Sequence, residues 1–275
     1  MSKCSLTTAE RSLVQAVWSH YAVAGRHDLP WRRAVDPYRI VVSEVMLQQT
    51  QVVRVVPKYT AFIRKFSNTK QLAVAPLSAV LVAWQGLGYN RRAKMLHACA
   101  QHVHAQYNGR WPRSYDAVRV LPGIGPYTAG AVMAFAYNTA VPMIETNIRT
   151  VYLHHIFSNQ TDVSEATLLH SVERTLDTKR PREWYWALMD YGAHLKKTVG
   201  NNIRRARDYQ PQSRFEGSVR QVRGAVLRYL SCNQFATLRQ LEQAVAGSAQ
   251  LPAVLIALER EGLIIQTGSR WCLPA

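Results

Sequence analysis

The chain has 275 residues, with 34 lysines and arginines against 17 aspartates and glutamates, and a formal net charge of +17. It has no apolar run near the roughly 20 residues that cross a bilayer and no signal peptide at its polar start, which argues against a membrane protein. We expect a soluble, intracellular protein of the cytoplasm or nucleoid, and so large a basic excess is typical of nucleic-acid-binding proteins.

Apolar residues at three- and four-residue spacing predict a mainly helical chain up to residue 195. The predicted helices cover 12–22, 40–49, 53–65, 79–86, 91–106, 114–121, 128–136, 147–157, 164–176 and 183–195. Further helices are expected over 219–229, 238–244 and 251–261, before two short strands about Thr267-Gly268-Ser269. The sequence predicts an all-α fold with a domain over 1–212 and a small winged-helix-like domain over 213–275.

A glycine-rich turn stands before one of these helices. In Leu121-Pro122-Gly123-Ile124-Gly125-Pro126-Tyr127-Thr128, Gly123 and Gly125 permit a tight turn with exposed amides, and the helix is expected to open at Thr128. Amides at the start of a helix bind anions, and in so basic a chain the expected anion is a nucleic-acid phosphate. A turn between two bundle helices would show the same residues.

The cysteines Cys4, Cys99, Cys232 and Cys272 lie far apart. Their spacing matches no metal site, so we expect free thiols in a reducing compartment and no bound metal.

Three further segments specify a family when they are taken with the turn. They are Leu29-Pro30-Trp31-Arg32, Ser43 to Val52, and Gly86-Leu87-Gly88-Tyr89 before Arg91. Together with the turn they resemble the helix-hairpin-helix DNA glycosylases, and among these the adenine-specific MutY type. The resemblance runs from about Leu29 to Ala193 and implies a two-lobed helical glycosylase fold.

The resemblance implies two catalytic carboxylates. Glu44 matches the family's catalytic glutamate, which protonates the departing base, and Glu145 stands where the superfamily has an aspartate that stabilises the cation-like sugar. Asn147 matches the asparagine that orients this second carboxylate. Glu44 could instead be a surface residue of its helix, and Glu145 could act only as a helix cap.

Tyr127 stands where bifunctional relatives such as endonuclease III have a nucleophilic lysine. A phenol cannot form a Schiff base with the sugar, so strand cleavage is not expected. Water would complete the reaction and leave an abasic site. The enzyme is therefore predicted to be monofunctional.

The resemblance also implies a base pocket and a DNA surface. Trp31 and Arg32 match pocket residues, although Trp31 could equally pack in the core; Trp186 replaces a polar residue and can only donate a hydrogen bond. Gln48, Gln49, Thr50 and Tyr89 match positions that wedge into the duplex or touch the opposite base. The other residues expected to contact DNA are Arg91, Gly123, Gly125, Thr128, Arg149, Lys196 and Lys197.

Many relatives carry a four-cysteine iron-sulfur cluster just after the segment that matches Met189 to Ala193. Here no cysteine follows before Cys232, so we expect no cluster and no other cofactor, although the hairpin could bind a monovalent cation. A basic stretch from Lys196 to Arg207, with Lys197, Arg204 and Arg205, stands in its place. It could contact the DNA backbone or be a solvated linker.

These observations predict a monofunctional, monomeric DNA glycosylase that acts on duplex DNA and removes adenine mispaired with 8-oxoguanine or guanine. Glu145, Trp186 and the absence of a Nudix-like domain depart from the MutY pattern. Removal of another base remains open, such as uracil, mismatched thymine or an alkylated purine. So does a non-catalytic DNA-binding relative; RNA binding is less favoured because no aromatic RNA-recognition motif is present.

Overall fold

The computed structural model describes residues 5–207, 211 and 214–275. Cys4 and the predicted domain boundary between 212 and 213 lie outside the described residues. The chain forms two compact units, each built from segments that are not contiguous in the sequence. Unit 1 contains Met1–Val41, Arg113–Val120 and Ile124–Pro211, and unit 2 contains Val42–Pro112, Leu121–Gly123 and Gln212–Ala275.

The helices of unit 1 match the predicted ones to within a few residues at most ends. They are α1 (Thr8–Ala24), α7 (Tyr115–Arg119), α8 (Pro126–Tyr137), α9 (Thr146–His155), α10 (Glu165–Thr175) and α11 (Pro181–Thr198), with the 3-10 turns η1 (Pro30–Arg33) and η2 (Asn202–Arg205). The expected start of α8 at Thr128 was two residues late, because Pro126 occupies its first turn, where a missing N–H costs nothing.

The core of unit 1 forms where α11 packs against α9 and α1. Trp184, Tyr185, Tyr152 and Ile148 are fully buried there. Each such side chain contributes roughly 1.5–3 kcal/mol by leaving water. The Tyr152 hydroxyl shares a hydrogen bond with Thr175 on α10. The buried phenol therefore keeps a polar partner.

Helix α2 (Pro37–Leu47) begins in unit 1 and ends in unit 2. Unit 2 then contains α3 (Val52–Lys65), α4 (Thr69–Ala73), α5 (Leu77–Ala83) and α6 (Arg91–Tyr107). Short α4, which the sequence pattern did not predict, packs along α6. Its five residues are too few for a periodic pattern, and the Asn68 side chain caps its start by accepting from the Gln71 amide.

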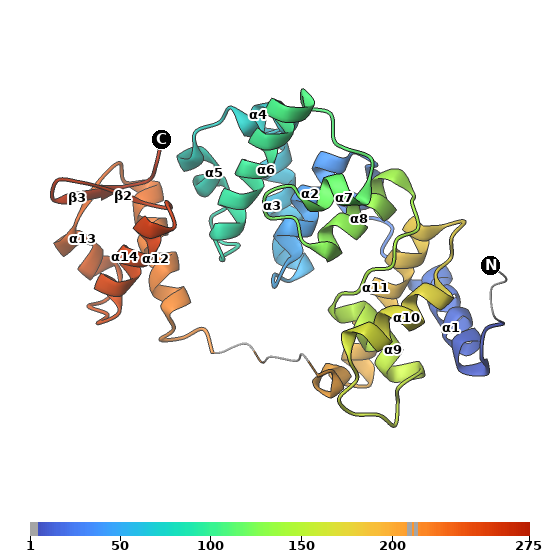
Figure 1. Cartoon of the computed structure of the whole chain (residues 1–275). Coiled ribbons are helices and arrows are strands. Elements are labelled where there is room, and N and C mark those ends of the chain that lie inside the picture. The colour runs from blue at the N-terminus through green and yellow to red at the C-terminus, as the bar shows by residue number, and fades with distance from the viewer. Residues whose placement is uncertain (1–4, 208–210, 212–213) are drawn as a thin grey trace. The chain divides into compact units, whose positions relative to one another are not determined.

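The end of the chain has the element order of a winged helix. It runs α12 (Val219–Cys232), β1 (Ala236–Thr237), α13 (Leu238–Ala244), α14 (Leu251–Arg260), β2 (Ile265–Thr267) and β3 (Arg270–Cys272). The strands form an antiparallel sheet in the order β1-β3-β2 beside the three helices (Figure 1). The predicted hairpin is confirmed; the two-residue strand β1 was missed because it pairs only with the distant β3.

None of the helices in the described part of the chain combines the length and the hydropathy that a bilayer-spanning helix needs.

A histidine in unit 1 predicts a pH dependence of stability. The ring of His155 hydrogen-bonds the Tyr191 hydroxyl and stacks edge-on against His154. Burial, and then the charge of His154, lower the pKa of His155 to about 4. Because the unfolded chain binds this proton near pH 6.5 and the folded chain does not, the free energy of unfolding should fall as the pH drops from about 6.5 to 4. Urea midpoints measured at half-unit steps would show it.

Replacing His155 with glutamine should reduce the slope of that part of the profile, to which His20 and His97, whose pKa values burial also lowers, contribute as well. Glu10 provides an internal control in a separate range. Its hydrogen bond with Arg174 lowers the pKa of Glu10 to about 2 despite partial burial, so its contribution is lost only below about pH 4.5. A wild-type profile that stays level between pH 6.5 and 4.5 would contradict the burial of a neutral His155.

Candidate active site and DNA-binding loops

Glu44 lies near the end of α2, in the part of the helix that belongs to unit 2. It is 5% exposed, and its neighbours Ser43, Val45 and Met46 are buried as well. The surface-helix interpretation of Glu44 is therefore wrong. A buried carboxyl group needs interactions that offset its desolvation, since acidic residues are seldom buried without a partner.

Arg92, at the start of α6, holds the helix end that carries Glu44. Its Nη1 donates to the carbonyl oxygens of Val45 (2.6 Å) and Gln48 (2.6 Å), and its Nη2 donates to the carbonyl of Gly88 (3.2 Å). It thereby connects the loop at 48–50 with the loop at 86–89. Burial lowers the pKa of Arg92 to about 10. Arg91, the predicted DNA contact, is exposed beside it, and two adjacent arginines at a helix start do not show from the sequence which one turns inward.

Arg92→Lys should destabilise the protein by about 1–3 kcal/mol, because an ammonium cannot reproduce the planar fork and leaves carbonyl oxygens without donors. Urea unfolding would measure this loss. Arg91→Lys is the matched control and should leave the midpoint unchanged, since Arg91 is exposed. Equal midpoints for the two variants would show that Arg92 does not hold the loops.

Glu145 is the N-cap of α9. Its Oε1 accepts from the amides of Asn147 (2.8 Å) and Ile148 (2.9 Å), and its Oε2 accepts from the Thr146 hydroxyl (3.0 Å) and from Asn147 Nδ2 (3.3 Å). The helix start favours the negative charge of this carboxylate. These hydrogen bonds confirm that Glu145 caps α9, and the residue as a whole is half-buried.

Lys196 completes this group from α11. Its Nζ donates to Asn147 Oδ1 at 2.9 Å, so the asparagine amide is fixed with its NH₂ toward Glu145. Burial lowers the pKa of Lys196, while the charge of Glu145 raises it. The structure therefore brings together the predicted residues Glu145, Asn147 and Lys196, with Lys196 engaged inside unit 1 rather than extended into solvent.

Gly192 permits the close crossing of α9 and α11 at this point. A Cβ placed at Gly192 would lie 2.2 Å from the carbonyl oxygen of Asn147. Gly192→Ala should therefore destabilise the protein by about 1–3 kcal/mol through overpacking, which exceeds the gain of up to about 1 kcal/mol in helix propensity. Thermal unfolding would measure the change.

Gly224 in α12 is the matched control because nothing lies within 4 Å of its missing Cβ. Gly224→Ala should stabilise the protein slightly, by up to about 1 kcal/mol. The two substitutions should therefore change the free energy of unfolding in opposite directions. A Gly192→Ala protein as stable as the wild type would show that α9 and α11 do not cross this closely.

Arg32 is buried in η1 against α11. Its guanidinium donates to both carboxylate oxygens of Asp190, at 2.7 and 2.8 Å, and the two side chains are 4% and 1% exposed. The guanidinium also lies 5.4 Å from the ring centroid of Trp186, which stacks on Phe135. The predicted pocket residues Arg32 and Trp186 are thus in contact, and Trp31 is buried beside Arg32 in η1.

Asp190 was missed as a site residue. Its only signal in the sequence is an acidic residue inside an apolar helix segment. Burial alone would raise the pKa of Asp190, but the hydrogen bonds and charge of Arg32 outweigh burial and lower it. The backbone amide of Arg26 donates to the same carboxylate. Asp190 therefore fixes Arg32 in the orientation that it presents to Trp186.

The glycine turn has the conformation that its sequence suggests. Gly123 has φ +75°, in the left-handed region, and its Cβ would lie 2.7 Å from the Met95 side chain. Gly125 is the N-cap of α8, with open space where a side chain would be. Thr128, predicted to contact DNA, is buried in α8. The Thr128 side chain is therefore not exposed for such a contact.

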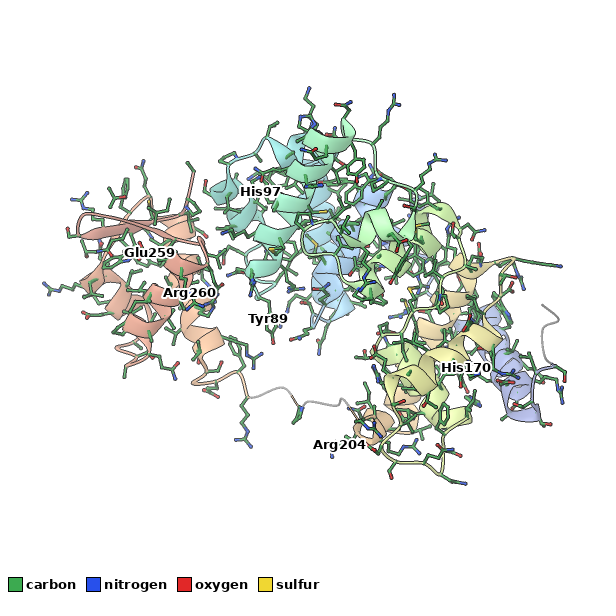
Figure 2. All side chains as sticks on the ribbon, in the orientation of Figure 1. Tyr89, His97, His170, Arg204, Glu259 and Arg260 are labelled. Carbon is green, nitrogen blue, oxygen red and sulfur yellow. The ribbon has the colours of Figure 1, made fainter. Side chains whose placement is uncertain are left out.

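The stretch after α11 does not fit an iron-sulfur cluster. Residues 194–207 contain no cysteine, and Arg205 instead donates to the carbonyl of Leu153 in the last turn of α9 and to that of Ser158 after it. Arg207 pairs with Asp162, while Lys197 and Arg204 are exposed and Arg204 extends from the surface in Figure 2. The solvated-linker interpretation is wrong for Arg205, which caps a helix end.

The remaining predicted contacts lie in both units. In unit 2, Gln49 is exposed with φ +55° and lies between the half-buried Gln48 and Thr50. In unit 1, Tyr127 is half-buried at the start of α8, and Arg149 pairs with Glu165 at 2.6 Å.

Comparison with known proteins specifies the family. The model of the HhH-GPD superfamily of base excision DNA repair proteins matches residues 42–174. An adenine DNA glycosylase of Mycolicibacterium smegmatis is 36% identical over 268 residues, which cover 88% of this chain and 89% of the relative. The chain belongs to the HhH-GPD superfamily. The resemblance inferred from the motifs is confirmed.

Other relatives of this HhH-GPD protein support the same family, and solved structures share its fold. An adenine DNA glycosylase of Mycobacterium tuberculosis is 33% identical over 90% of the chain and 89% of its own length. The solved structure of a thermostable thymine-DNA glycosylase aligns with a TM-score of 0.61 and 28% identity, over 67% of this chain and 86% of that one. An endonuclease III–DNA complex aligns at 0.55 with 18% identity, over 70% and 87%, and supports the fold alone.

Proposed function

We propose that this protein is a monofunctional DNA glycosylase of base excision repair that removes adenine mispaired with 8-oxoguanine or guanine. The observation that carries the proposal is its likeness, along 88% of the chain, to an adenine DNA glycosylase. The buried Glu44 and the capped Glu145 supply the two carboxyl groups that this reaction needs. Its partner is duplex DNA, and we expect it to act as a monomer.

In the proposed reaction, the target base leaves the stack and enters the site. The bond between the base nitrogen and sugar C1′ breaks, the electron pair goes to the base, and Glu44 delivers the proton. The Glu145 carboxylate stabilises the positive charge that develops on the sugar. Water then adds to C1′, releases a proton and leaves an abasic site. Tyr127 has no amine to attack C1′, so the strand stays intact.

A second candidate substrate is thymine in a G:T mismatch. The likeness to the thermostable thymine-DNA glycosylase favours it. So does Trp186: its indole N–H can only donate, and it therefore suits a carbonyl oxygen of thymine better than the amino group of adenine.

Single-turnover base release from a panel of duplexes tests the proposal. The panel pairs adenine with 8-oxoguanine and with guanine, and includes G:T, G:U and alkylated purines, with hot alkali to reveal abasic sites. A Glu145→Gln protein run beside the wild type tests the sugar-stabilising role. Release from the adenine pairs supports the proposal. Release only from G:T supports the second candidate, and intact binding without release from any duplex supports a non-catalytic DNA-binding protein.

A further inference from the structure

The winged-helix-like end of the chain contacts the loop that carries Tyr89, and both lie in unit 2. Arg220, in the first turn of α12, donates from Nη1 to the Tyr89 hydroxyl at 2.9 Å. Its guanidinium lies 5.7 Å from the Tyr89 ring centroid and 5.9 Å from that of Phe215. Aromatic rings and guanidinium groups are the side chains that stack on nucleic-acid bases, and this exposed cluster contains two such rings and one guanidinium.

Further contacts anchor α12 and its neighbours to the same unit. Gln85, after α5, donates to the Ser231 hydroxyl of α12 at 2.9 Å. Lys94 on α6 donates to the carbonyl of Glu261 after α14, and the amide of Ser78 donates to the carbonyl of Pro274 at 3.0 Å. These contacts lie near the two ends of α5 and in the first turn of α6. The position of Arg220 beside Tyr89 is therefore set by several independent attachments.

Tyr89 itself combines an exposed ring with an unusual backbone conformation. It is 36% exposed, extends from the loop before α6 (Figure 2), and has φ +46°, a conformation that costs a non-glycine residue free energy. A second guanidinium, that of Arg92, lies 5.6 Å from its ring centroid. Two cations thus hold an exposed aromatic ring whose family counterpart touches the mispair. Such preorganisation reduces the ordering that DNA binding requires.

We propose that Arg220 is a specificity-determining residue, through which the C-terminal domain positions the Tyr89 ring against the mispair. Arg220 acts on Tyr89 rather than on the reacting atoms, so it is a positioning residue. The partner recognised is the purine opposite the excised base. This inference rests on the proposed adenine-glycosylase function. It assigns to the C-terminal domain a part in reading the opposite base.

The test compares single-turnover rates on adenine opposite 8-oxoguanine and opposite guanine, and takes the ratio of the two rates. Arg220→Ala should change this ratio about tenfold, the size of effect expected when two contacting groups are uncoupled. Arg228→Ala is the matched control: Arg228 is exposed on the same helix and should leave the ratio unchanged. In a Tyr89→Ala background, Arg220→Ala should change the ratio no further.

An Arg220→Ala protein with the wild-type ratio, whether or not both rates fall, would overturn the proposal. Thermal unfolding of each variant separates misfolding from lost discrimination. If the wild type releases no adenine, the adenine-glycosylase function itself fails. The ratio of affinities for the same two duplexes, measured by fluorescence anisotropy with Glu44→Gln protein, then still tests Arg220. An affinity ratio that Arg220→Ala does not change would contradict its role in either case.

Discussion

Glu44→Gln is expected to slow base release by about 100- to 10,000-fold, the range over which a positioned general acid contributes. Glutamine keeps the shape of the buried side chain but has no proton to give to the departing base. Glu44 is buried at the end of α2, so its carboxyl group is shielded from bulk water. Single-turnover rates on the duplex that the wild type cleaves fastest would measure the loss.

Glu173→Gln is the matched control for charge, because Glu173 is exposed on α10. Its rate should equal that of the wild type. Duplex binding by Glu44→Gln should persist, since no phosphate contact is removed. A Glu44→Gln protein that releases base at the wild-type rate would leave Glu44 with a structural role and require another acid.

The second large effect concerns stability. Asp190→Asn should lower the free energy of unfolding by about 3–5 kcal/mol, because it leaves the buried guanidinium of Arg32 without its counter-charge. Breaking a buried pair costs much more than the pair contributes over a neutral replacement. Urea unfolding followed by tryptophan fluorescence would report it, since Trp186 lies against Arg32.

Asp162→Asn provides the control from the surface. Asp162 pairs with Arg207, but both side chains are more than half exposed, and asparagine suits the left-handed backbone of this position. Its urea midpoint should match that of the wild type. If Asp190→Asn also unfolded at the wild-type midpoint, the Arg32–Asp190 pair would not stabilise the fold as its burial indicates.

The local sequence determined most of the helices. In α1, α3, α6 and α11 the helical spacing of apolar residues extends over more than ten residues. It also determined the family, because Glu44 and the glycine turn belong to short motifs whose residues are neighbours in the chain. The lack of cysteines after Ala193 likewise needed no structure. The short elements α4 and β1 were not predicted, because five and two residues are too few to show a periodic pattern.

Tertiary structure alone decided the pairings. Arg92 binds the carbonyl of Gln48, which is 44 residues away in the sequence. Arg32 binds Asp190 across 158 residues, and Arg220 binds Tyr89 across 131 residues. Spacing along one sequence cannot specify such partners, because the packing of whole helices brings them together. The same holds for Glu145, whose residue type suggested both a helix cap and a catalytic group. Only the structure shows that its carboxylate binds the amides at the start of α9 and is connected through Asn147 to Lys196.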